Sequence, residues 1–109
     1  MEAQRYKELD DICKEMEKQM ARNIQETLEM YCKVIVDYSV IHNAFSCVAE
    51  IGFYDTTISS YSTIPAKELR NVTQDMFKGI CDEYAGAMAT ALKDFMARCE
   101  NEIKGGIKC

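Results

Sequence analysis

Residues 34–41 read Val-Ile-Val-Asp-Tyr-Ser-Val-Ile, and the conformation of this segment decides the fold of the chain. Its β-branched side chains favour a strand. Its apolar residues also belong to a seven-residue repeat that passes through the segment without a change of phase, which is typical of a helix with one apolar face. The core positions of this repeat are occupied by Leu28, Tyr31, Ile35, Tyr38, His42, Phe45 and Ala49.

The helical pattern also extends upstream of this segment. Met16, Met20 and Ile24 recur four residues apart, which places them on one helix face. The two patterns together predict a helix over residues 3–51, either continuous or broken. A continuous helix of this length spans about 70 Å, whereas a compact domain of this size has a radius of gyration near ~13 Å. A continuous helix therefore implies an elongated molecule.

Downstream, a second long helix is predicted after a connection rich in Ser and Thr at residues 52–64. Pro65 suits the first turn of a helix because its φ angle is fixed. The pair Gly105-Gly106 is a typical helix stop. Within this helix, a run of small residues around Gly86 and Ala87 predicts the close approach of another helix, since glycine otherwise weakens a helix.

These patterns predict an all-α fold with a single helical domain over residues 1–109. Its two long helices would form an antiparallel hairpin that dimerises into a four-helix bundle, because a two-helix hairpin leaves one side of a broad apolar face in water. An α+β fold with a small three-stranded meander at about 33–63 stays open as the alternative. The core and dimer interface of the bundle would contain Leu28, Tyr31, Ile35, Tyr38, His42, Phe45, Gly86 and Ala87.

Composition argues against two classes of ligand surface. The net charge is −5, and the basic residues are scattered among acidic ones, whereas nucleic-acid binding needs a clustered basic surface. The stretch from Val34 to Ala49 is too short to cross a membrane. The N-terminal residues form no apolar leader. We therefore expect a cytoplasmic protein whose six cysteines, Cys109 included, are reduced thiols.

No residue pattern points to catalysis or to a cofactor. His42 is the only histidine, and Asp37 and Cys47 each lie five residues from it, off the spacing that puts residues on one helix face. The cysteines form no C-x-x-C pair, and the chain has no Gly-rich phosphate loop. We expect no enzyme activity, no metal and no cofactor.

The remaining function is binding to another protein through a helical surface. A small acidic domain of this kind suits an adaptor, a chaperone or a stoichiometric inhibitor, such as a phage-encoded inhibitor of a host protein. The aromatic-rich connection would supply the partner-binding residues; they are Phe53, Tyr54, Ile58 and Tyr61. The alternative is a small-molecule binder with a pocket between helices, lined by Tyr31, Tyr38, His42 and Tyr84.

Overall fold

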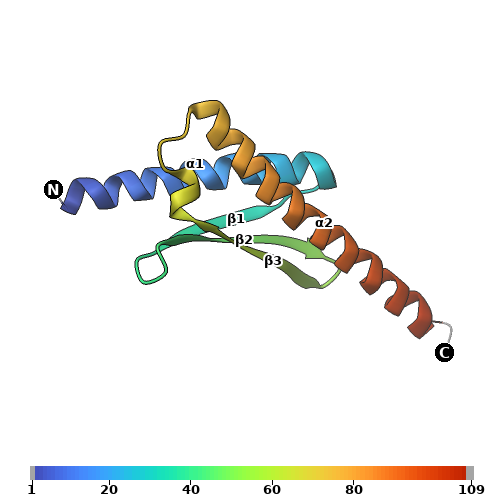
Figure 1. Cartoon of the computed structure of the whole chain (residues 1–109). Helices are drawn as coiled ribbons and strands as arrows, with labels where there is room; N and C mark the ends of the chain where they lie inside the picture. Colours follow the sequence, from blue (N-terminus) through green and yellow to red (C-terminus); the bar gives the residue numbers. More distant parts are fainter. Residues whose placement is uncertain (1, 108–109) are drawn as a thin grey trace.

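The structure, a computed structural model, describes the backbone of residues 2–107 and the side chains of residues 8–102; Cys109 lies outside the described residues. Both helices lie on one face of a three-stranded antiparallel meander (Figure 1). The fold is therefore α+β, and the prediction of an all-α helical bundle or coiled coil is wrong. In chain order the elements are α1 (Glu2–Leu28), β1 (Lys33–Ser39), β2 (Ala44–Phe53), β3 (Thr56–Pro65), a 3-10 turn η1 (Ala66–Leu69) and α2 (Gln74–Ile107).

The segment that decides the fold is strand β1, followed by a tight loop. Val34 and Val36 are buried, whereas Lys33 and Asp37 are exposed, which is the two-residue alternation of a strand with one face on a core. The loop of residues 40–43 closes the β1–β2 hairpin without glycine, because Asn43 itself adopts the left-handed conformation with a φ of 47°.

The seven-residue repeat fails because the chain reverses at residues 40–43 and the two strands then set which residues share a face. Ile35 and Ala49 share a heptad position, but Ile35 pairs with Val48 and points away from the helices, whereas Ala49 pairs with Val34 and is fully buried beneath them. The helix predicted over residues 3–51 ends at Leu28. Its stop is Glu29, which has a φ of 56° and donates its N–H to the carbonyl of Gln25 at 2.8 Å.

Helix α2 differs from its prediction at both ends. Pro65 ends β3 and is followed by η1, so the helix begins only at Gln74. Thr73 caps it, since its Oγ1 accepts the N–H of Met76 at 3.2 Å. Gly105-Gly106 does not stop the helix, which runs to Ile107. The close helix contact predicted at Gly86 is also absent within the described residues, because a Cβ added there would meet nothing within 4 Å.

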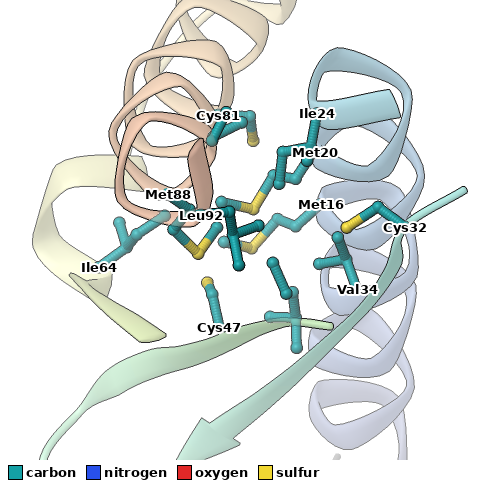
Figure 2. Packing of buried hydrophobic residues seen from close by; sticks show 14 of the residues in the cluster. Met16, Met20, Ile24, Cys32, Val34, Cys47, Ile64, Cys81, Met88 and Leu92 are labelled. Atoms are coloured by element: carbon teal, nitrogen blue, oxygen red, sulfur yellow. The ribbon is translucent and has the colours of Figure 1, made fainter. Parts of the chain in front are cut away.

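The core fills the space between the two helices and the sheet (Figure 2). Met16, Met20 and Ile24 of α1 have no exposed surface, as their spacing predicts. Sheet residues such as Cys47 and Ile64 meet them from the other side. A polar clamp joins the helices, and its residues are Gln19 and Asn23 of α1, which donate side-chain N–H groups to Oδ1 of Asp82 at 3.0 and 3.3 Å.

The molecule is elongated, although neither helix has the length predicted for the first. Its extents are 62 × 26 × 19 Å, and its radius of gyration is 16.2 Å, against roughly 13 Å for a compact domain of this size. The two helices cross the sheet and reach past it at opposite ends (Figure 1). Within the described part of the chain, the helices therefore cover one face of the sheet and leave the other face exposed (Figure 1).

Candidate protein-binding site

The edge of the sheet at β1 is closed by side chains from α1. The N–H of Val36, which points away from β2, donates to Oε2 of Glu17 at 2.8 Å. Just before the strand, the carbonyl of Cys32 accepts the side-chain N–H of Gln25 at 2.8 Å. Unpaired strand edges attract other chains, and natural proteins cover or charge them. Helix α1 does both at this edge.

Among residues 8–102, no side chain closes the edge at β3 in this way. A two-residue loop, Tyr54 and Asp55, joins β2 to β3, so the flanking pair Phe53 and Thr56 exchanges hydrogen bonds. Hydrogen-bonded and non-hydrogen-bonded pairs alternate along the strands, so the backbone N–H and C=O groups of the even-numbered residues of β3 point towards β2. The backbone groups that point outward, away from the sheet, therefore belong to Thr57, Ser59, Tyr61 and Thr63.

The bond from Val36 to Glu17 supports this register independently. Cys47 pairs with Ser62 in β3 and with Val36 in β1. If Cys47 exchanges hydrogen bonds with Ser62, its backbone groups point away from β1, and the N–H of Val36 must point outward. That N–H does point outward, to Glu17.

The composition of β3 leaves this edge without the usual protection. Residues 56–64 contain no charged side chain, and the only proline of the chain, Pro65, stands at the end of the strand. Within residues 8–102, no side-chain hydrogen bond reaches the outward backbone groups of β3. The ten-residue strand thus presents a row of free backbone donors and acceptors.

The face of the sheet opposite the helices, here called the outer face, is also uncovered. Its centre is an apolar row across the three strands, Ile35, Val48 and Tyr61. Tyr61 is 74% exposed. A Cβ added to Gly52, on the same face, would meet nothing within 4 Å. Polar rows flank the apolar row, with Lys33, Glu50 and Ser59 on one side and Asp37, Ser46 and Thr63 on the other.

Sequence reasoning missed most of these positions. Residues 52–64 were predicted to be a connection, although most of them form β3. Its two buried residues, Ile58 and Ile64, lie an even number of residues apart, as strand residues on one face must. That spacing was the available signal. The role of Glu17 left no signal, since only the tertiary structure brings it to β1.

The four residues predicted to bind a partner lie on or near the β2–β3 hairpin, in different environments. Tyr54 is 70% exposed at the tip of the hairpin. Phe53 is half-buried and packs edge-on against Tyr54, with ring centroids 4.6 Å apart. Tyr61 belongs to the outer face, whereas Ile58 is a core residue with 3% exposure. The hairpin thus presents Tyr54 and Tyr61 to solvent together.

The four residues proposed to line a ligand pocket are spread over the molecule. Tyr31 is exposed before β1, and His42 is exposed in the β1–β2 loop. Tyr38 donates its hydroxyl to Oδ1 of Asn43. Tyr84 lies on α2 and donates to Oε2 of Glu68 at 2.6 Å, which raises the pKa of Tyr84 to about 12. Tyr38 lines a shallow hollow with Leu9 and Cys13, and none of the other three residues contributes to it.

The residues predicted for the core and dimer interface also separate. Phe45 is buried, and Leu28 is half-buried against the core. Ile35 lies on the outer face. Gly86 and Ala87 lie on the side of α2 that is turned towards solvent, since the buried side consists of Cys81, Ala85, Met88, Ala89 and Leu92.

Four cysteines are free, buried thiols: Cys13, Cys32, Cys47 and Cys81. Burial raises the pKa of Cys47 from 9.0 to about 12 and that of Cys13 and of Cys81 to about 11. These thiols stay protonated at neutral pH and are poor nucleophiles. Among residues 8–102, no three His, Cys, Asp or Glu side chains are placed to hold a metal ion.

The raised thiol pKa values predict a loss of stability in alkali. A group whose pKa is higher in the folded state gives its full stabilisation below its unfolded pKa and loses it as pH rises through the folded pKa. We expect the urea midpoint to fall as pH rises from 9 towards 11, and to fall less steeply in Cys47→Ala. A midpoint that stays constant to pH 11 would contradict the burial of these thiols.

The contact between Glu17 and the β1 edge predicts a second effect on stability. Glu17→Ala leaves the N–H of Val36 unpaired beneath α1, so we expect a loss of about 1–3 kcal/mol in the free energy of unfolding. Glu15→Ala is the matched control, because Glu15 is exposed on the same helix. Chemical denaturation of both variants measures the difference. Equal effects of the two substitutions would show that Glu17 does not close this edge.

Comparison of the chain with protein-family models, curated proteins and solved structures finds no match. No helix among the described residues is both long enough and apolar enough to cross a membrane.

Proposed function

We propose that this chain is a non-enzymatic protein-binding module that receives an extended segment of a partner protein along β3. The observation that supports the proposal is the difference between the two edges of the sheet. Side chains of Glu17 and Gln25 close the β1 edge. At β3, residues 56–64 are uncharged, and no side chain among residues 8–102 bonds to the outward backbone groups of the strand. An exposed strand edge is the receiving element of β-strand addition.

In this mode, main-chain hydrogen bonds supply affinity and alternate side chains supply specificity. The outward groups of Thr57, Ser59, Tyr61 and Thr63 would pair with the partner's backbone. On the outer face, side chains of the added strand would lie beside Tyr61, whose exposed ring suits an interface anchor. An adaptor, a chaperone or a stoichiometric inhibitor can each act by holding such a segment.

The binding surface of this proposal is the sheet and not the helical surface expected from the sequence. The helices use their apolar sides to cover the sheet, and their residues Met16, Met20, Met88 and Leu92 are at most 2% exposed. These side chains have no surface left for a partner, and the exposed apolar residues of α2, Met76 and Phe95, lie 19 positions apart and form no continuous patch. The sheet keeps both a free edge and a free face.

The test is selection of binders from a random library of extended 12-residue peptides against the immobilised chain. We expect selected peptides to alternate apolar and polar residues. Ser59→Pro should weaken the binding of a selected peptide by about tenfold or more, because it removes an outward N–H. Ser59→Ala is the matched control, since it keeps the backbone N–H and should bind as the wild type does.

Two results would overturn the proposal. One is a library that yields no binder. The other is a set of selected peptides that bind Ser59→Pro as tightly as Ser59→Ala, because they would occupy a surface other than the β3 edge.

A further inference from the structure

The outer face of the sheet has a property that the proposed strand addition does not use. Its polar rows carry opposite charges on β1, with Lys33 two residues before Ile35 and Asp37 two residues after it. Two-residue steps keep these side chains on one face of the strand. The charges therefore stand at equal distances on either side of the apolar row.

We infer that two copies of the chain pack with their outer faces together, about a two-fold axis that runs along the row Ile35, Val48 and Tyr61. Rotation about this axis reverses the strand direction. Each residue of the row then meets its own copy, and Lys33 meets the partner's Asp37 on both sides of the axis. The surface is self-complementary, as an isologous interface requires.

The other in-plane axis, parallel to the strands through β2, fits the charges poorly. It would bring Glu50 against the partner's Glu50, because both lie on the central strand of the face. Like charges in contact disfavour an interface. About the proposed axis, Glu50 instead meets the partner's Ser46, which is uncharged and accepts or donates a hydrogen bond.

The size of the face sets the strength of this dimer. Three strands spaced ~4.8 Å apart and about seven residues long cover roughly 300–350 Å² in plan per copy. Two such faces fall below the roughly 1,200–2,000 Å² that standard stable interfaces bury. Sheets pack face to face with their strands at about −30°, which lets Val48 and Tyr61 interdigitate with their copies. We therefore expect a reversible dimer that dissociates on dilution.

Sedimentation equilibrium of the full chain, with reductant, over a range of concentrations tests the inference. We expect a mass that rises from 12.4 kDa towards twice that value. Lys33→Asp and Asp37→Lys should each weaken association by about tenfold, because each places like charges together across the axis. The double variant, which exchanges the two charges, should restore most of the lost affinity.

The matched controls are Lys67→Asp and Asp55→Lys, which make the same charge changes at exposed positions off the outer face. They should leave association unchanged. Val48→Lys, which puts two ammonium groups on the axis, should abolish the dimer while the circular dichroism spectrum is retained. This variant keeps the test decisive if either β1 substitution disturbs folding.

Three results would overturn the inference. One is a mass that stays at 12.4 kDa at all concentrations. The second is a double variant that associates no better than the single ones. The third is loss of the dimer in Ser59→Pro but not in Ser59→Ala. The last result would show that two β3 edges pair instead. The two surfaces share Tyr61, but peptide binding depends on the outward N–H of Ser59, whereas dimerisation depends on the charges of Lys33 and Asp37, so each proposal can fail without the other.

Discussion

Replacing Ile24 by Ala should destabilise the chain by about 2–5 kcal/mol, a large part of the roughly 5–15 kcal/mol that holds a domain of this size folded. Ile24 has no exposed surface. Ile24 follows Met16 and Met20 on the buried side of α1, and all three point into the core that α1 shares with α2 and the sheet (Figure 2). Truncation removes buried methyl groups and leaves a cavity in this core, which adds to the cost.

Ile41→Ala is the control, because Ile41 is 91% exposed in the β1–β2 loop. The change should alter the free energy of unfolding by less than about 0.5 kcal/mol. In the helix predicted over residues 3–51, Ile41 would lie three residues after the core position Tyr38 and widen the apolar face, so its truncation would be costly. Urea titrations followed by circular dichroism compare the two. Equal destabilisation would contradict the loop at residues 40–43.

Proline substitution at two adjacent positions of β3 should have opposite consequences. The N–H of Ser60 points to β2, where Ser60 pairs with Ala49. Ser60→Pro removes a ladder hydrogen bond and forces the ring against the neighbouring strand, so we expect a loss of about 3 kcal/mol or more. Ser59→Pro removes an outward N–H that has no partner in the sheet, and edge strands tolerate such a proline.

The thermal midpoints of the two proline variants measure this difference. Ser59→Pro should melt within a few degrees of the wild type, whereas Ser60→Pro should melt far lower, since ~1 kcal/mol corresponds to about 4–8 °C in a domain of this size. The reverse order would mean that β3 pairs with β2 in the register shifted by one residue, and the outward groups would then belong to the even-numbered residues.

Sequence periodicity correctly predicted the buried side of α1, which depends only on residues close together in the sequence. The stripe Met16, Met20 and Ile24 predicted the buried side of α1, because a helix turns by a fixed angle at each residue. The same periodicity was misleading from Leu28 onward. Apolar residues at both odd and even positions fit a heptad, but Val34 and Val36 lie two residues apart between exposed Lys33 and Asp37, which fits a strand as well.

Turn chemistry explains why the wrong pattern was chosen. A tight hairpin is normally marked by glycine, and the β1–β2 loop contains none. Asn43 and Tyr54 take positive φ values of 47° and 56° instead. Asn does so at small cost, whereas a bulky residue such as Tyr pays strain that the surrounding strands must offset. The sequence signal for both turns was therefore weak.

The candidate site could be predicted only in part. The exposed aromatic residues Tyr54 and Tyr61 were proposed from composition, and their role in binding stays a prediction. The open edge depends on strand order. Both β1 and β3 are edge strands, but α1 covers the edge of β1, and within the described residues no fourth strand pairs with β3. That order arises from contacts between distant segments, which local patterns do not contain.

Amide hydrogen exchange along β3, measured residue by residue by nuclear magnetic resonance, tests the open edge most directly. We expect fast exchange at the outward amides of Thr57, Ser59, Tyr61 and Thr63. The amides paired with β2 should exchange at least roughly a hundredfold more slowly, because they open only with the sheet; they belong to Ile58, Ser60, Ser62 and Ile64. Equal protection of the two sets would contradict a free β3 edge, and with it the proposed strand addition.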